Sequence, residues 1–189
     1  MGDPSSWPWN RLLLALPSGL LKRLTPELER IHCDREQSLI DADSVLDHVF
    51  FPDSGVISVV AVYADGSIIE MATIGREGCT GEAIFGAKSS SARFFVQIPG
   101  SAARMSRSAF TRAMRSMPAF RNLMNAYVHA FLEQLMISRI AIGCLPYLGN
   151  GRTPSTHLPS KYMKATKATT TSAQLNIVSL NKRIRPPGA

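Results

Sequence analysis

Apolar and polar residues alternate through much of residues 31–105. The run VISVVAVY at residues 56–63 is rich in β-branched side chains, and a second run, IIEMATI, follows at residues 68–74. Between the two runs stands Asp65–Gly66, a strong hairpin signal because both residue types tolerate the turn conformation. Several short strands separated by such turn residues predict an antiparallel sandwich or barrel, with a jelly roll as the leading candidate.

Helical patterns frame this β-rich region on both sides. Leucines recur at helical spacing within residues 1–30, which predicts N-terminal helices there. Residues 106–144 show the same kind of spacing, and Pro118 is expected to divide a short helix from a longer one. Ser106 or Ser108 stands where a capping side chain would begin the short helix.

The longer of the two C-terminal helices is expected to support a homodimer. About 24 residues would span about 36 Å, which exceeds what is needed to cover a small barrel. Because its apolar face is also wide, we expect one side to pack on the barrel and another to meet a second copy. The residues expected at that interface are Leu123, Tyr127, Phe131 and Leu135. A helix that packs wholly within one chain is the alternative.

The positive charge of the chain is concentrated at its C-terminal end. The 189 residues carry a net charge of +7, yet 14 basic residues balance 14 acidic ones up to Cys144. Residues 145–189 hold the other seven basic residues, no acidic residue and no sustained periodicity. We therefore expect an irregular basic tail, which is either inert or able to bind nucleic acid weakly through its phosphates.

Several classes of protein are excluded by what the sequence lacks. Its apolar runs fall short of the roughly 18 residues of a membrane span, so no membrane partner is expected. The three cysteines lie far apart without a CxxC pair, which leaves no ligand set for zinc or iron–sulfur clusters and suits a reducing cytoplasm. The four histidines form no HxH pair and no GxSxG elbow is present, so we expect neither a metal nor enzymatic activity.

Together these patterns predict an α+β chain of four parts. They are N-terminal helices (1–30), a β jelly roll (31–105), a helical segment with a dimerisation helix (106–144) and a basic irregular tail (145–189).

The loop GREGCTGE at residues 75–82 is the candidate binding feature of the β-rich part. Its three glycines permit a tight connection between strands, and this alone would explain them. The carboxylate of Glu82 is either a ligand-binding group or a loop-closing one that pairs with Arg76 or Arg93.

The order of these parts resembles the sensor domain of the Crp/Fnr family of bacterial transcription regulators, over residues 10–144. The motifs that carry the resemblance are DHVFFPDSGVISVV, DGSIIEMATIGREG and the pair Gly81–Glu82. The resemblance implies a cytoplasmic, non-enzymatic regulatory domain. No cofactor is certain, and a cyclic nucleotide is the candidate ligand.

In the cyclic-nucleotide-binding members of that family, a Gly–Glu pair holds the ribose hydroxyl and an arginine neutralises the phosphate. The resemblance places Gly81 and Glu82 in the first role. Ser91 and Arg93 are the candidates for the second. If the strand FFVQI keeps the family register, however, Ala92 falls at the arginine position and Arg93 follows on the opposite face of the strand. A bulge could restore the arginine, or the lysine and hydroxyls of KSSS could replace it.

Members of the family continue from the long helix into a winged helix-turn-helix domain that reads DNA, which needs on the order of 70 residues. Only 45 residues follow Cys144, and they contain no paired helical periods. We therefore expect a truncated or frame-shifted relative of these regulators, without a recognisable reader for sequence-specific DNA binding. A stand-alone module that binds a cyclic nucleotide or another small anion is the alternative.

Overall fold

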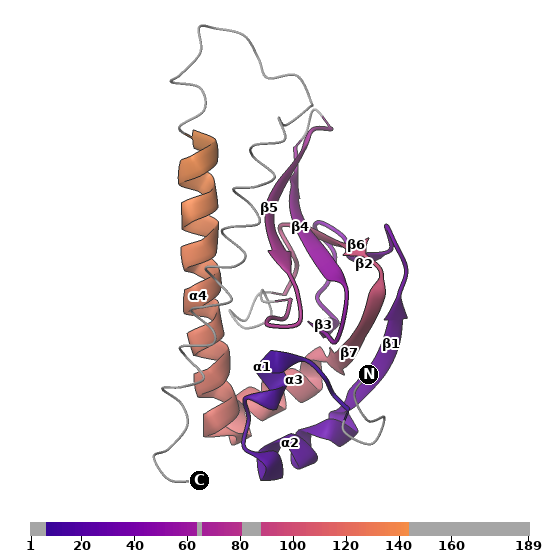
Figure 1. Cartoon of the computed structure of the whole chain (residues 1–189), viewed down its shortest axis with the longest axis vertical. Coiled ribbons are helices and arrows are strands. Elements are labelled where there is room, and N and C mark those ends of the chain that lie inside the picture. Colours follow the sequence, from indigo (N-terminus) through magenta and orange to yellow (C-terminus); the bar gives the residue numbers. More distant parts are fainter. Residues whose placement is uncertain (1–6, 64–65, 81–87, 144–189) are drawn as a thin grey trace, which may run out of the picture. The chain divides into compact units, whose positions relative to one another are not determined.

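A computed structural model of the chain describes residues 7–63, 66–80 and 88–143, with side chains described as far as Glu133. The chain divides into two compact units, Met1–Val128 and His129–Ala189. Both sheets and the first three helices belong to the first unit (Figure 1). The described part of the second unit is the C-terminal portion of the last helix.

The N-terminal segment forms two short helices, α1 (Arg11–Leu14) and α2 (Ser18–Leu24), as the leucine spacing predicts. One turn of 3-10 helix, η2 (Thr25–Glu27), follows. Strand β1 (Leu28–Cys33) then begins three residues before the predicted boundary at residue 31. The chain switches early because Leu28 to Cys33 pair along their whole length with another strand.

In the residues that the structure describes, seven strands form two antiparallel sheets, which confirms the predicted α+β class with an antiparallel β-rich region. The three-stranded sheet has the order β1-β7-β3, with β7 at Gly100–Ser106 and β3 at His48–Pro52. The four-stranded sheet has the order β2-β6-β4-β5. Its strands are β2 (Ser38–Ile40), β6 (Arg93–Ile98), β4 (Val56–Val62) and β5 (Ile68–Ile74).

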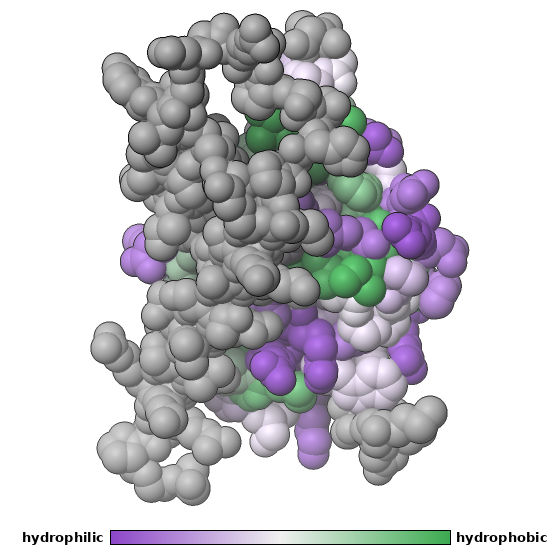
Figure 2. All heavy atoms as spheres, turned by 45° about the horizontal axis from the view of Figure 1, so that its top comes forward, coloured by the Kyte–Doolittle hydropathy of each residue, from purple (hydrophilic) through white to green (hydrophobic). Residues whose placement is uncertain are grey.

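The predicted hairpin is present and joins β4 to β5, which pair from Ile57–Ile74 to Val62–Ile68. Gly66 has a φ of +83° in this turn, a conformation that glycine adopts without strain. Helices α1 to α3 gather at the end of the sheets opposite this hairpin tip (Figure 1). The tip is apolar and exposed, with Val62, Tyr63 and Ile68 each about half accessible. Figure 2 shows such hydrophobic groups set among hydrophilic ones on the face that it presents.

Two other segments with turn-forming residues, PDSG (residues 52–55) and Pro99–Gly100, do not make hairpins. Each carries the chain from one sheet to the other, from β3 to β4 and from β6 to β7. The two corners touch, because a Cβ at Gly55 would lie 2.4 Å from the Ile98 carbonyl oxygen and one at Gly100 would lie 2.5 Å from that of Ser54. Only glycine permits this close approach of two backbones.

Two helices follow the last strand and are divided at Pro118, as predicted. Helix α3 (Arg107–Ser116) begins at Ser106, whose hydroxyl accepts from the Ala109 N–H at 3.3 Å. Helix α4 (Pro118–Gly143) starts anew at the proline. The rings of Phe110 and Phe120 meet edge to face at 5.5 Å across this break, and both side chains are buried. No described helix is both long and apolar enough to cross a membrane.

Two residues expected at a dimer interface instead pack inside the chain. Leu123 and Tyr127 are each only 3% exposed, because they belong to the buried stripe of α4. That stripe comprises Phe120, Leu123, Met124, Tyr127 and Val128. Phe131 is half-buried, and the side chain of Leu135 lies outside the described residues. The alternative of packing within one chain therefore holds for the first part of the helix.

Candidate functional site

The candidate site lies on the connection between β5 and β6. The structure describes both ends of this connection, residues 75–80 and 88–92. Gly81 and Glu82, which the resemblance assigns to a ribose, lie outside the described residues. The geometry of the site is therefore that of the two ends and of the elements that hold them.

Thr80 ties the first end of the connection to β3. Its N–H donates to the Phe50 carbonyl at 3.0 Å, and its hydroxyl accepts from the Phe50 N–H at 3.0 Å. Thr80 is 2% exposed. A threonine side chain thus completes a strand-like pair of hydrogen bonds, and the residue directly before Gly81 is fixed in place.

The second end of the connection is tied to the segment that precedes β3. The Leu46 N–H donates to the Lys88 carbonyl at 3.1 Å, and Ser90 exchanges hydrogen bonds with that segment through the Asp43 N–H at 2.7 Å and the Ser44 carbonyl at 3.0 Å. Both ends of the connection are therefore hydrogen-bonded to the same stretch of chain, residues 43–50.

The glycine-spaced turn at the first end is held by its own polar groups. The Gly75 N–H donates to Glu77 Oε1 at 3.1 Å, and the Gly78 N–H donates to the Gly75 carbonyl at 3.1 Å. The Arg76 guanidinium donates to the Trp9 carbonyl at 3.3 Å, and the Arg76 carbonyl accepts from the Arg11 N–H at 2.7 Å. The turn is thus joined to the N-terminal segment.

Tyr127 joins the same turn to α4. Its hydroxyl donates to the Cys79 carbonyl at 2.8 Å in a buried position. A Cβ on Gly78 would lie 2.7 Å from that hydroxyl oxygen, so the helix and the loop touch where only glycine fits. Burial, the largest cause, raises the pKa of Tyr127 well above its ordinary value, so the phenol stays a neutral donor.

Asn10 joins the N-terminal helices to the site from the other side. Its amide donates to the carbonyls of Pro52 at 2.7 Å and Gly78 at 3.0 Å, and its oxygen caps α1 through two backbone N–H groups. Nearby, the buried carboxylate of Asp53 accepts from the indole of Trp7 at 2.7 Å and the N–H of Trp9 at 2.8 Å. The side chains of Asn10 and Asp53 are both buried, and these hydrogen bonds satisfy their polar atoms.

Ala92, the residue before β6, and Arg93, the first residue of β6, face opposite sides. Ala92 is 2% exposed and shares the buried face with Phe94. The Arg93 side chain is 40% exposed on the other face, over the ring of Phe95. Its Nε is buried and lies 3.6 Å from Asp41 Oδ1, which is an ion pair but too long for a hydrogen bond. β6 begins at Arg93, and β2 bulges opposite the next two residues, Phe94 and Phe95, yet the arginine stays on this outer face.

The cysteines of the site region have no reactive environment. Burial raises the pKa of the Cys79 thiol, and burial followed by the charges of Asp34 and Asp53 raises that of Cys33. A thiol with a raised pKa is a poor nucleophile. Within the described residues, no three His, Cys, Asp or Glu side chains come together as a metal site would require.

Residues 30–117 match the family model described as the cyclic nucleotide-binding domain. They form a cyclic nucleotide-binding domain. No curated protein matches the sequence.

Solved regulator structures share the fold of this cyclic nucleotide-binding domain. The c-di-GMP responsive global regulator CLP of Xanthomonas campestris aligns with a TM-score of 0.61 and 11% identity over 70% of this chain and 66% of its own, just under two thirds. CooA of Carboxydothermus hydrogenoformans aligns with a TM-score of 0.55 and 16% identity, covering 74% of this chain and 86% of CooA. The sensor domain of the regulator DNR of Pseudomonas aeruginosa aligns at 0.51 and 15%, covering 76% and 89%. The predicted resemblance to Crp/Fnr sensor domains is confirmed at the level of the fold.

The sequence did not predict the contact that joins the cyclic nucleotide-binding domain to α4, the helix that follows it and is called its exit helix below. Tyr127 was expected on a dimer surface, but its hydroxyl holds the loop that leads to Gly81. One signal was present: a residue with a polar tip stands in an otherwise apolar helical stripe. A buried tyrosine hydroxyl usually has a partner, so such a position indicates a contact within the fold. The predicted ligand roles of Ser91, Arg93 and the Gly81–Glu82 pair stay predictions.

Proposed function

We propose that this chain is a non-enzymatic, cytoplasmic sensor module of the Crp/Fnr type, in which a small ligand bound at the β5–β6 connection changes the position of α4. The observation that carries the proposal is the buried hydrogen bond from Tyr127 to the carbonyl of Cys79. It joins the exit helix to the loop of a cyclic nucleotide-binding domain two residues before the predicted ligand group Gly81.

The mechanism follows from how the first end of the loop is held. Three consecutive residues there are hydrogen-bonded to other elements. Gly78 is bonded to Asn10, Cys79 to α4 and Thr80 to β3. A ligand that contacts Gly81 or Glu82 must either leave these three contacts intact or move them together. A ligand shifts an equilibrium only between states that it binds differently, so the states must differ in the position of residues 78–80 and of the helix attached to them.

The ligand must be one that does not need an inward arginine. A cyclic phosphate held inside a β domain requires a cation or several aligned donors. The described face on which Ala92 lies offers no guanidinium, because Arg93 lies on the other face beside Asp41. We therefore expect cyclic AMP and cyclic GMP to bind weakly, through hydroxyl and backbone donors of residues 81–91.

Dimerisation through α4 remains part of the proposal, at Phe131 and Leu135 rather than at the buried residues before them. Light scattering of the purified chain gives its mass in solution. A dimer that Phe131→Ser converts to monomer supports this contact, whereas a wild-type monomer at all concentrations removes dimerisation from the proposal.

Calorimetric titration with cyclic AMP and cyclic GMP tests the ligand site. Binding heat that is lost in Glu82→Ala, and kept in the matched control Glu133→Ala, supports a site in the loop. Absence of heat and of any thermal shift for both nucleotides would remove cyclic nucleotides from the proposal.

The coupling is tested separately by hydrogen exchange of α4 amides. A ligand that protects or exposes these amides in the wild-type chain, and binds without doing so in Tyr127→Phe, supports a sensor. Binding that leaves α4 unchanged in the wild-type chain supports the second candidate, a stand-alone binding module. The lack of paired helical periods in the sequence of residues 145–189 favours this candidate over a DNA reader.

A further inference from the structure

A hollow of about 810 Å³ lies along the outer side of α3. Its wall includes Asp47, Ser108, Thr111, Arg112, Arg115 and Ser116. All of these residues belong to the first compact unit. The hollow therefore lies within the cyclic nucleotide-binding domain, along α3.

The spacing of the helical wall residues places polar groups side by side. Ser108, Thr111, Arg112 and Arg115 stand at positions i, i+3, i+4 and i+7, which share one face of a helix. The opposite face, with Ala109, Phe110 and Ala113, is buried and holds the helix against the sheets. The polar face of α3 is therefore turned away from the core of the domain.

The charge of this face is positive and only partly compensated. Helix α3 contains three arginines and no acidic residue. Arg107 donates to the Lys88 carbonyl at 3.2 Å, and Arg112 donates to Glu27 at 2.9 Å. For the Arg115 guanidinium and the Thr111 hydroxyl, the part of the chain that the structure describes provides no partner.

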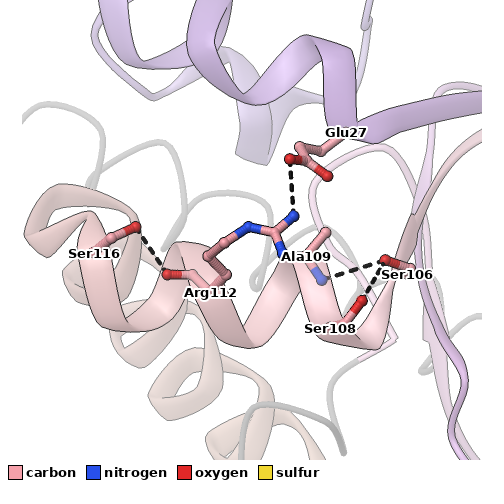
Figure 3. A network of polar contacts seen from close by, with 6 residues as sticks. All are labelled: Glu27, Ser106, Ser108, Ala109, Arg112 and Ser116. Atoms are coloured by element: carbon pink, nitrogen blue, oxygen red, sulfur yellow. Dashed lines mark hydrogen bonds and ion pairs between the residues drawn. The ribbon is translucent and has the colours of Figure 1, made fainter.

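Glu27 orients Arg112 but accepts a hydrogen bond from only one of its nitrogens. Figure 3 shows Arg112 reaching from α3 toward Glu27, with the Ser116 hydroxyl donating to the Arg112 carbonyl at 2.8 Å. A guanidinium has five N–H donors, and this ion pair uses one nitrogen. The remaining donors of Arg112 stay available beside Arg115.

We propose that this hollow binds a phosphate monoester carried by a small molecule. The phosphate lies between Arg112 and Arg115 and accepts a hydrogen bond from the Thr111 hydroxyl. Two guanidinium forks and a hydroxyl match the directions of the three terminal oxygens of a phosphate. The proposal does not depend on the ligand site in the β5–β6 connection.

Asp47 limits the ligand to one phosphate. It lies at the start of α3, where its carbonyl accepts from the Arg107 N–H at 2.8 Å. Asp47 also lines the same hollow, and its negative charge would repel a second phosphate. The hollow is far larger than one phosphate, so the remainder of the molecule lies toward Asp47 and is neutral or cationic.

Nuclear magnetic resonance titration of the full chain with glycerol 1-phosphate tests the site, with glycerol and sodium chloride at equal ionic strength as reference titrations. We expect saturable shifts of the α3 amides with glycerol 1-phosphate alone. Arg115→Gln should weaken binding about tenfold, which corresponds to about 1.4 kcal/mol. The matched control Arg35→Gln, an exposed arginine between β1 and β2, should not change it.

The same titrations contain the results that overturn the proposal. They are an absence of saturable shifts in α3, equal shifts with sodium chloride, or equal weakening by Arg35→Gln. Unchanged amide positions outside α3 in Arg115→Gln show that the variant is folded. In addition, fructose 1,6-bisphosphate should bind no more tightly than glycerol 1-phosphate to the wild-type chain and more tightly to Asp47→Asn. The reverse order contradicts the assigned orientation.

Discussion

Gly66 and Gly78 stand near the two ends of β5, and they are glycines for different reasons. Gly66 has a φ of +83°, and a Cβ there would meet nothing within 4 Å. Gly78 has no positive φ, but a Cβ would lie 2.7 Å from the Tyr127 hydroxyl and 3.1 Å from Ile74 Cγ2. The first glycine provides a backbone conformation and the second provides space.

The difference shows which end of the strand the rest of the fold uses. At the hairpin end, apolar side chains such as Ile68 and Tyr63 are exposed. At the other end, Cys79 and Thr80 are buried and their backbone groups have partners on β3 and α4. A substitution near Gly78 should therefore disturb the contacts of several elements, whereas a substitution at Gly66 should affect only the hairpin.

Gly78→Ala should have the largest effect. The new methyl group must displace Tyr127 or Ile74, both of which are buried, so we expect a loss of about 3 kcal/mol in the free energy of unfolding. Urea denaturation measures it. In the double variant Gly78→Ala/Tyr127→Phe the atom nearest to the new methyl group is missing, so the double variant should lose less than the sum of the two single ones. Strict additivity would contradict the close contact.

Asn10→Ala should cost about 2 kcal/mol, because it removes the cap of α1 and two donors to buried carbonyls. The matched variant Asn10→Asp keeps the capping oxygen but cannot donate to Pro52 and Gly78. It should also be destabilised in urea denaturation. If Asn10→Asp matches the wild type, only the cap matters and the N-terminal helices are not bound to the loop in the way described.

Tyr127→Phe should cost about 1.5 kcal/mol at neutral pH, because the Cys79 carbonyl loses its donor in a buried place. Burial raises the pKa of Tyr127 in the folded chain, so the folded state keeps a proton that the unfolded state releases above pH of about 10. The stability that the neutral phenol contributes is present below that pH and is lost as the pH rises. Denaturation at several alkaline pH values should therefore show a smaller decline for Tyr127→Phe than for the wild type. An identical decline would mean that the phenol titrates normally.

Gly66→Ala should have the smallest effect, about 1 kcal/mol, because it only places a side chain in a left-handed conformation. Gly66→Asn should cost less, since asparagine tolerates this conformation. Thermal unfolding of both variants measures the difference. A loss at Gly66→Asn as large as that at Gly78→Ala would erase the distinction between the two glycines.

Much of the candidate site could not be predicted from the sequence because its contacts join distant segments. Periodicity placed Tyr127 on an apolar helical face, but it could not say that the face packs inside the chain. The alternation of a strand predicted that Ala92 and Arg93 face opposite sides, and in the structure Ala92 is buried while Arg93 is partly exposed beside Asp41. The resemblance assigned ligand roles to Gly81 and Glu82, and these remain predictions.

The sequence by itself determined the elements whose signals are local. Alternation gave the strands, Asp65–Gly66 gave the β4–β5 hairpin and Pro118 gave the division between α3 and α4, since backbone preferences act over a few residues. Only the tertiary structure decided that PDSG and Pro99–Gly100 pass between sheets, and that a tyrosine on α4 holds the loop after β5. Those contacts join residues up to 48 positions apart. Their partners are chosen by how the two sheets and the helix pack, and no local pattern encodes that choice.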